Sequence, residues 1–387
     1  MKIAVNTRLL QKDKLEGIGW FSFEVLKRIT QQHPEHQFYF LFDRPFSSDF
    51  IFSENITPIV LFPQARHPVL FKIWFNWSVA KFLKTNKIDV FFSPDGYLSL
   101  RTNIPQIATI HDLNFEHFPE FFPKHILRFY KKYFPLFANV SQRIITVSEF
   151  SKKDIHTCYN IPLNNIDVAY NGVNPIFSPL SDSEQQIVRN KISDGNPYFV
   201  YIGSLNKRKN IANMLRAFDL YKSNNPMYKH KFLIVGEAMF THQDIDEIYL
   251  SMHYKNDVIF LGRLYDADLK SILSSASALL YVSYFEGFGI PIVEAMQSGV
   301  PVITGTNSSM PEIGGNAALY CEPNNIHQIA EAMNKVTNPK LRKELIQKGL
   351  ERAKQFNWDN TAHRVWKSIE KVLNELPDYN LDVPFQE

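Results

Sequence analysis

The stretch that decides the fold lies at residues 284–299 and reads YFEGFGIPIVEAMQSG. It follows an apolar run at 278–282 (ALLYV), which is typical of a strand buried on both faces. Glu286 and a Gly-Phe-Gly turn come next, and Pro291 occupies a position suited to the first turn of a helix. The stretch therefore predicts a strand, a glycine turn and a helix N-terminus, in that order.

This predicted turn has the properties of an anion-binding site. Backbone N–H groups and the positive end of the helix dipole point at whatever binds there. We place Glu294 on the opening turn of the helix, eight positions after Glu286. The two carboxylates would repel a simple phosphate, but they accept hydrogen bonds from sugar hydroxyls. The pattern therefore favours a ligand with both phosphate and hydroxyl groups. The alternative is a structural strand–turn–helix joint in which Glu294 stabilises the start of the helix.

Length and composition indicate a globular protein of more than one domain. A chain of 387 residues favours two or three domains, and 45% hydrophobic with 21% charged residues is typical of folded proteins. The net charge of +3 is too small to argue for nucleic acid, so we expect no nucleic-acid partner. Cys158 and Cys321 are far apart, which favours reduced thiols in a cytoplasm over a disulfide.

The ends and the hydropathy of the chain agree with a cytoplasmic location. The chain opens MKIAVN, directly into a predicted strand, with no signal-peptide pattern. No uncharged apolar run is long enough to span a bilayer. We therefore expect a cytoplasmic protein, with peripheral contact at the inner membrane face as an open alternative.

The first half of the chain alternates strands and helices. Apolar runs predict strands at 2–6, 37–42, 57–61, 89–92, 106–110, 143–147 and 167–170. Helical periodicity between the strands is clearest at 20–29, 69–83 and 124–137. This alternation predicts a mostly parallel sheet covered on both faces.

A second α/β series follows residues 171–180, where two prolines and a glycine predict a linker. Its strands are predicted at 198–202, 231–235, 258–261, 278–282 and 301–304, and its helices at 211–221, 244–252, 267–274, 291–298, 326–336 and 339–353. A last amphipathic helix is expected near 361–373. The fold class is therefore α/β, with two doubly wound Rossmann-like domains that bind ligands at the carboxyl ends of their strands.

Polar residues at two further predicted strand ends complete the candidate site. His111 follows the strand at 106–110, where it could donate to a sugar hydroxyl or act as an acid or base, although a structural histidine is the alternative. Arg208 and Lys209 follow the strand at 198–202, where a guanidinium fork and an ammonium point charge suit a diphosphate. The alternative for these two cations is ordinary surface charge.

The sequence gives little support to a metal site. The D-x-D strings at 244–246 and 266–268 precede predicted helices, so we expect them to be first-turn acids. No group of His or Cys has the spacing of metal ligands, and we expect neither a metal nor another cofactor. The chain also lacks G-x-S-x-G and a phosphate loop ending in Gly-Lys-Ser or Gly-Lys-Thr.

Taken together, the motifs resemble those of the retaining glycosyltransferases of the GT-B fold, in the large group that includes bacterial mannosyltransferases and lipopolysaccharide sugar transferases. The resemblance covers nearly the whole chain, and the E-x7-E pair is its most specific part. The matching segments occur in family order: EGIGWFSFEVL, ATIHDLNFEHFPEFF, RIITVSEFSKKDI, AYNGVNPIFSP, FVYIGSLNKRKNI, FLGRLYDADL, YFEGFGIPIVEAMQSGVPVITG and SSMPEIGGNAALYCEP.

The resemblance implies a role for each matched site residue. Glu286 and His111 would contact the transferred sugar, and Glu294 the ribose of the nucleotide. The other donor contacts would come from Gly17, Gly19, Arg208, Lys209, Gly287, Phe288 and Gly289. Ser204 departs from the family, because many relatives carry an arginine there.

The resemblance also implies a domain layout and a reaction. Residues 1–175 would form the acceptor domain and 176–361 the nucleotide-sugar donor domain, with 362–387 crossing back to the first. The reaction would move a hexose from a nucleotide diphosphate sugar, GDP-mannose being the first guess, to a glycan or lipid-linked acceptor in cell-surface polysaccharide assembly. A nucleotide-sugar epimerase of the same fold and a non-catalytic sugar-nucleotide binding subunit are the open alternatives.

One segment of the first half suggests a membrane contact. Residues 63–84 interleave aromatic rings with cations, which is typical of a helix at a lipid interface. The residues concerned are Phe71, Trp74, Phe75 and Trp77 with Arg66, Lys72, Lys81 and Lys84. The alternative is that Trp74, Trp77 and Phe82 form the buried face of an ordinary helix.

Overall fold

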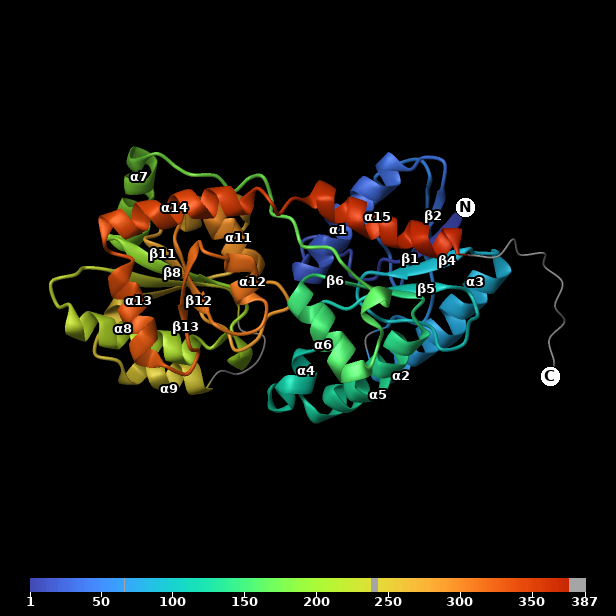
Figure 1. Ribbon diagram of the computed structural model, residues 1–387, viewed down its shortest axis with the longest axis horizontal. Helices are drawn as coiled ribbons and strands as arrows, with labels where there is room; N and C mark the ends of the chain where they lie inside the picture. The colour runs from blue at the N-terminus through green and yellow to red at the C-terminus, as the bar shows by residue number, and fades with distance from the viewer. Residues whose placement is uncertain (66, 238–242, 376–387) are drawn as a thin grey trace.

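The structure is a computed structural model, and it describes residues 1–65, 67–237 and 243–375. Two α/β halves lie next to each other along the long axis of the molecule (Figure 1). Each half has a parallel sheet between layers of helices, with seven strands in the first sheet and six in the second. The predicted fold class of two doubly wound domains is confirmed.

The first sheet has the strand order β3-β2-β1-β4-β5-β6-β7. Its strands are β1 (Lys2–Asn6), β2 (Gln37–Phe42), β3 (Ile56–Val60), β4 (Val90–Ser93), β5 (Gln106–Thr109), β6 (Arg143–Thr146) and β7 (Ile166–Val168). Its helices are α1 (Gly17–Gln32), η1 (Ser48–Phe50), α2 (Pro68–Ile73), η2 (Trp74–Val79), α3 (Ala80–Thr85), α4 (Asn114–His117), η3 (Pro119–Phe121), α5 (Lys124–Val140), α6 (Glu149–Tyr159) and η4 (Leu163–Asn165).

The second sheet has the order β10-β9-β8-β11-β12-β13. Its strands are β8 (Tyr198–Ile202), β9 (Lys231–Val235), β10 (Val258–Gly262), β11 (Ala278–Tyr281), β12 (Val302–Gly305) and β13 (Ala318–Cys321). The helices of this half are α7 (Asp182–Ser193), η5 (Lys207–Lys209), α8 (Ile211–Asn224), α9 (Gln243–Ser251), η6 (Lys255–Asp257), α10 (Asp266–Ser274), α11 (Ile290–Gln297), α12 (Met310–Gly314), α13 (Ile326–Lys335) and α14 (Pro339–Ala353).

The predicted strands are all present, because strands buried on both faces are continuous apolar runs. All residues of β8 and β11, for example, are buried. The strand β13 and the helices α4, α6, α7 and α12 were not predicted from the sequence. The sequence carried one usable signal for α7, since Ser181 and Glu184 form a capping box at its start. The helix expected at 69–83 is present as α2, the π-helix η2 and α3 in succession.

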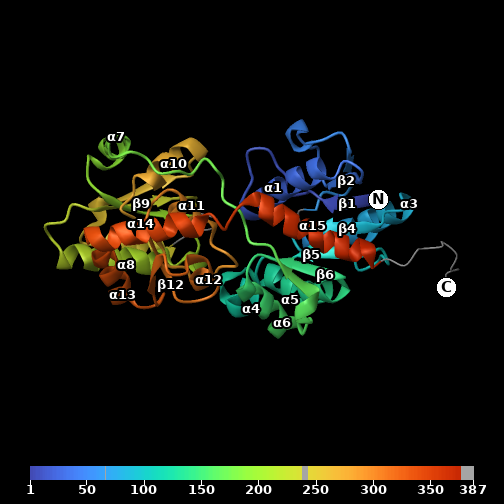
Figure 2. The same ribbon diagram turned by 45° about the horizontal axis from the view of Figure 1, so that its top comes forward.

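The last helix, α15 (Trp358–Asn374), leaves the second half and packs along α1 of the first (Figures 1 and 2). Arg28 of α1 donates to Asp359 at 2.6 Å, and the ring of Trp366 stacks on His33 at 3.7 Å. At Gly172 an added Cβ would lie 2.4 Å from the backbone nitrogen of Trp358, so the two connections between the halves touch here. The predicted crossing segment also includes 376–387, which lie outside the described residues.

Within residues 1–65, 67–237 and 243–375, no helix combines the length and the apolar character needed to cross a bilayer.

Asp167 lies in β7, the edge strand of the first sheet, and accepts hydrogen bonds from Ser368 and Lys371 of α15. Burial raises the pKa of Asp167, but hydrogen bonds from Arg143, Lys371 and Ser368 outweigh burial and bring this pKa to about 2. A folded-state pKa below the ordinary 3.8 stabilises the fold above pH 4, and this stability is lost as the pH falls toward 2.

We predict that Asp167→Asn lowers the free energy of unfolding by about 2 kcal/mol at pH 7. Thermal melts of both proteins across pH should show the difference shrinking below pH 4. A deficit that stays constant down to the lowest pH would mean that lost packing, not lost charge, causes the effect.

Candidate functional site

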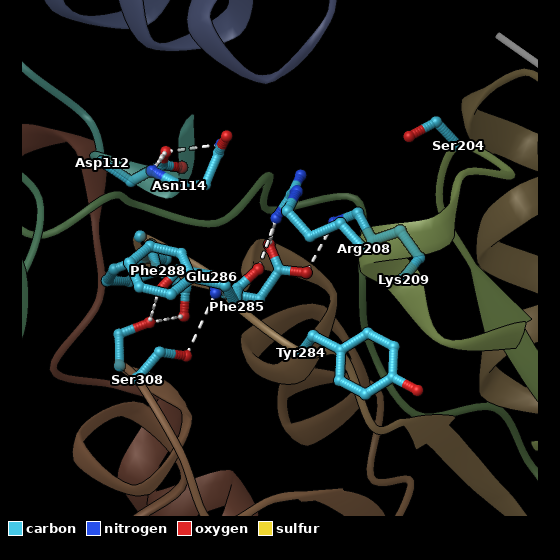
Figure 3. A network of polar contacts seen from close by, with 12 residues as sticks. Asp112, Asn114, Ser204, Arg208, Lys209, Tyr284, Phe285, Glu286, Phe288 and Ser308 are labelled. Carbon is cyan, nitrogen blue, oxygen red and sulfur yellow. Dashed lines mark hydrogen bonds and ion pairs between the residues drawn. The ribbon is translucent and has the colours of Figure 1, made fainter. Parts of the chain in front are cut away.

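The candidate site lies at the carboxyl ends of β8 and β11, which are neighbours in the second sheet. Arg208 and Lys209 come from η5 after β8, and Glu286 comes from the loop after β11 (Figure 3). The amide of Tyr284 donates to the carbonyl oxygen of Arg208 at 2.8 Å and holds the two loops together. The structure therefore brings Glu286 next to two cations that lie 78 and 77 positions before it in the sequence.

Both oxygens of the Glu286 carboxylate accept from these cations. Nη1 of Arg208 lies 2.9 Å from Oε2, and Nζ of Lys209 lies 2.7 Å from Oε1. The side chains of Glu286 and Lys209 are 7% and 9% exposed. Nζ of Lys209 also donates to the hydroxyl of Tyr281 at 2.7 Å. The buried Lys209 and the partly buried Arg208 thus share one carboxylate, so these three groups together carry one net positive charge. The charge of Asp112 also acts on both cations.

The pKa values follow from this arrangement. Burial raises the pKa of Glu286, but Arg208 and then Lys209 outweigh burial and bring it to about 2. Burial lowers the pKa of Lys209 to about 8, although Glu286 attracts its proton. Burial also lowers the pKa of Arg208, but the charges of Glu286 and Asp112, with the hydrogen bond to Glu286, together raise it by more, so its net shift is upward. All three groups are therefore charged at pH 7.

The glycine turn after Glu286 is shaped by close contact with the first half. An added Cβ on Gly287 would lie 2.3 Å from the carbonyl oxygen of His111, so only glycine fits there. Gly289 has φ +93° and is the N-cap of α11, a conformation that glycine adopts without strain. The Phe288 ring is buried against Tyr170 and Phe356, which leaves its backbone for any ligand contact.

His111 follows β5 and faces this turn. Its Nε2 lies 2.8 Å from the carbonyl oxygen of Pro94, so Nε2 donates and Nδ1 is the unprotonated nitrogen. Burial lowers the pKa of His111, only partly offset by the hydrogen bond to Pro94, so the ring is neutral at pH 7. The ring packs edge-on against Phe21 of α1 at 4.9 Å.

The other predicted donor contacts lie apart from the Glu286 cluster. Glu294 is the fifth residue of α11 and partly buried, so the prediction that it lies on the opening turn is wrong; the helix starts at Ile290, one residue earlier than predicted. Gly17 is the first residue of α1 and is exposed, while Gly19 is buried against the loop at Leu9. Ser204 accepts a hydrogen bond from Asn206 and does not join the cluster (Figure 3).

Sequence reasoning missed the residues that join the halves. The hydroxyl of Ser148 donates to the carbonyl oxygen of Gly287 at 2.7 Å. The carboxylate of Glu312 accepts from the backbone N–H groups of Glu149 and Phe150, both at 2.8 Å, in the first turn of α6. These pairs lie more than 130 positions apart, at 139, 163 and 162, so no local pattern could reveal them.

A second buried ion pair occupies the corresponding place in the first half. Arg8 follows β1 and donates from Nη2 to Asp95, which follows β4, at 2.7 Å. Asp95 also accepts from Asn6 at 2.7 Å. Both residues follow predicted strands, which was the signal available for them. The guanidinium of Arg8 lies over the rings of Phe71 and Tyr97, at 4.8 and 4.6 Å.

The structure shows possible metal-ligand groups that were not predicted from the sequence. Within the described residues, two groups could supply three ligands each: His33, Glu35 and His36, and His117, Asp154 and Cys158. Sequence spacing alone could not predict the second group, because folding brings His117 close to Asp154 and Cys158 from a separate segment. Neither group includes the cations around Glu286. The acids Asp244 and Asp246 lie in the first turn of α9, as predicted.

Comparisons with known proteins show similarity to glycosyltransferases over most of the chain. Residues 182–352 match the family described as "Glycosyl transferases group 1", and residues 16–176 match "Glycosyltransferase Family 4". The chain is 28% identical over 372 residues to the O-antigen chain mannosyltransferase B of Escherichia coli, which covers 93% of this chain and 97% of the relative. It is 26% identical over 247 residues to the O-antigen chain mannosyltransferase RfbU of Salmonella typhimurium, with coverage of 60% and 64%.

Solved structures show the same fold. Anabaena HepE, solved in complex with UDP-glucose, superposes with a TM-score of 0.72 over 96% of this chain and 100% of its own, at 17% identity.

Gly287 provides a test of the contact between the halves. We predict that Gly287→Ala destabilises the protein by about 1–3 kcal/mol, because the new methyl group would overlap the carbonyl oxygen of His111. Gly17→Ala is the matched control, since an added Cβ there has nothing within 4 Å. Thermal melts that place the two variants at the same stability would contradict this contact.

Proposed function

Because this chain is a glycosyltransferase of the GT-B fold, similar over most of its length to a bacterial O-antigen mannosyltransferase, we propose that it transfers a hexose from a nucleotide diphosphate sugar with retention of configuration at the anomeric carbon. We take GDP-mannose as the first candidate donor, because two relatives are mannosyltransferases. The acceptor we propose is a glycan or lipid-linked saccharide of cell-surface polysaccharide assembly. The observation that carries the proposal is the pair of cations at the carboxyl end of β8, the buried Lys209 and the partly buried Arg208.

In this proposal the excess charge of the cluster binds the donor diphosphate. Arg208 offers a planar fork and Lys209 a point charge, and both lie where low exposure strengthens electrostatic attraction. The same charge stabilises the diphosphate as it leaves, so it acts on the transition state as well as on the bound donor. The phosphate oxygens would share the two cations with Glu286.

The sugar lies beside Glu286 and His111 in this proposal. When Arg208 and Lys209 bind phosphate oxygens, they donate less to Glu286. The carboxylate oxygens of Glu286 can then accept hydrogen bonds from sugar hydroxyls. Nε2 of His111 donates a hydrogen bond to the carbonyl oxygen of Pro94, so Nδ1 remains available to accept a hydrogen bond from the sugar. We assign Glu294 to the ribose. Backbone amides of Gly17, Gly19, Gly287, Phe288 and Gly289 complete the donor contacts.

Retention in this proposal does not use Glu286 as a nucleophile. A carboxylate with a pKa of about 2 and both oxygens held by cations is a weak nucleophile. Instead, the bond from the anomeric carbon to the phosphate oxygen breaks, and the acceptor oxygen bonds to that carbon on the same face. The acceptor proton passes to the leaving diphosphate, and closure of the halves excludes water.

Product analysis distinguishes the three functions considered. The protein is incubated with GDP-mannose or UDP-glucose and a saccharide acceptor, and the products are analysed by proton NMR. We predict a new glycosidic bond with the anomeric configuration of the donor. Inversion at C2 of free donor would identify an epimerase, and donor binding without any product would identify a binding subunit.

The same assay tests the prediction that no metal is needed. Arg208 and Lys209 supply the charge that a divalent ion supplies in metal-dependent enzymes, so turnover should be unchanged in EDTA. Loss of turnover with EDTA and rescue by magnesium or manganese would contradict this assignment.

The pH profile tests Lys209 directly. Its pKa is lowered to about 8 by burial, so the ammonium loses its proton as the pH rises through 8 and one positive charge leaves the site. We predict that kcat/KM for the donor falls above pH 8, and that Lys209→Arg removes this alkaline fall. A wild-type profile that stays flat well above pH 8 would show that Lys209 does not bind the diphosphate.

We also propose peripheral contact of residues 63–84 with the inner membrane face. Fewer side chains are available for this contact than the sequence predicted. Trp74 and Phe75 are buried, so for Trp74 the core alternative is correct. Val69, Ile73 and Trp77, at 55%, 39% and 60% exposure, lie on one helical stripe and are the apolar side chains available to lipid. Lys72 and Lys81 are exposed near this stripe, Phe82 is partly buried, and Arg66 lies outside the described residues.

Liposome co-sedimentation tests this contact. We predict binding to anionic vesicles at low salt, release at high salt, and weaker binding by Trp77→Ala. Met227→Ala, which changes an 87% exposed apolar residue of the other half, is the control. Protein that stays in the supernatant with anionic vesicles at low salt would exclude the contact.

A further inference from the structure

A cavity of about 420 Å³ lies between the halves, and none of the described residues of α11 lines it. From the first half, Phe118 and Phe121 line it, and from the second half Tyr284 and the first turn of α8. Helix α11, which carries Glu294, covers the opposite face of the second sheet from α8 and α9 (Figures 1 and 2). The cavity is therefore distinct from the ribose contact, although Lys207 and Tyr284 place it beside the Glu286 cluster.

Three aromatic rings form one wall of this cavity. Phe118 and Phe121 are stacked at 5.4 Å with 4° between their planes, and Tyr284 lies 6.2 Å from each. All three are only partly buried. Aromatic faces of this kind pack against the C–H face of a pyranose ring, to which they present the negative side of their quadrupole.

Amide side chains supply the polar contacts. Four line the cavity: Asn206, Asn210, Asn213 and Asn324. Asn210 is 2% exposed, and its Nδ2 donates to the carbonyl oxygens of Val282 and Pro323. Within the part of the chain that the structure describes, its Oδ1 has no hydrogen-bond partner. This oxygen is itself shielded from solvent, so the amides available to a ligand are those of the more exposed Asn206 and Asn324.

The charges that line the cavity indicate a neutral ligand. Lys207 and Arg216 are balanced by Glu120 and Asp244. A phosphate site would carry an excess of cations, as the Glu286 cluster does. Balanced charge, amides that both donate and accept, and a ring wall together suit a polyhydroxylated neutral ring.

We propose that this cavity is a saccharide subsite, which holds a hexose unit of the acceptor glycan other than the unit that receives the transferred sugar. This inference rests on the proposed glycosyl transfer and specifies where a longer acceptor lies. Because the two halves each contribute a wall, a bound saccharide unit also stabilises their contact. Residues of both halves would therefore contact the additional sugar units of a longer acceptor.

Binding without turnover tests the subsite. A mannotetraose and methyl mannoside are used as probes in saturation-transfer NMR, with no nucleotide sugar present. We expect the tetraose to bind to the wild type, and Tyr284→Ala and Phe121→Ala to weaken its Kd by about tenfold, since each loses one aromatic stacking partner. Tyr284→Phe, which keeps the ring, should bind within about twofold of wild type, and circular dichroism melts check that each variant folds.

Kinetics provide the second readout. The ratio of kcat/KM for the tetraose to that for methyl mannoside should fall in Tyr284→Ala and Phe121→Ala. Equal tetraose affinity in Tyr284→Ala and wild type, or an unchanged ratio, would overturn the subsite. A wild-type protein that binds the tetraose but transfers no sugar from any donor would instead contradict the proposed function, so the two failures are distinguishable.

Discussion

The buried carboxylate of Glu286 between Arg208 and Lys209 is the interaction on which the site depends. A charge away from water needs a partner, and removing one member of such a pair typically costs about 3–5 kcal/mol. Here two cations share one anion, so the cluster is held in place and still carries positive charge. In the proposed function, this unbalanced charge is what attracts the donor diphosphate to a site with a carboxylate at its centre.

The topology explains where this cluster forms. In the second sheet the strand order reverses between β8 and β11, and the loops after these strands supply the cations and the carboxylate. In the first sheet it reverses between β1 and β4, where Arg8 and Asp95 pair. Crevices at such reversals are where doubly wound sheets bind ligands. Gly287 against the carbonyl of His111 then brings the two crevices into contact, with Gly172 and Trp358 marking the crossing of the two connections.

Much of this was predictable from sequence, and what was missed has a common cause. The described strands other than β13 were found because doubly buried strands are apolar runs, and the site residues because they follow those runs. Within the site, the pairing of Glu286 with two cations was not foreseen, since it joins separate loops across 77 positions. The contacts of Ser148 and Glu312 join separate halves. Side-chain pairing across the fold depends on backbone geometry, which no local pattern encodes. The placement of Glu294 failed for a smaller reason, a one-residue error in where α11 begins, which moves Glu294 just past the first turn.

The most direct test is a double-mutant cycle on Lys209 and Glu286, with the affinity for GDP and for UDP measured by calorimetry. These probes carry the diphosphate without the sugar, so they report on the cluster alone. If the cluster binds the diphosphate, Lys209→Met should weaken binding by tenfold or more, about 1.4 kcal/mol. Because Lys209 and Glu286 are in direct contact, the loss in the double variant with Glu286→Gln should differ from the sum of the single losses by about 1 kcal/mol or more. Unchanged affinity in Lys209→Met, or strict additivity, would contradict the account.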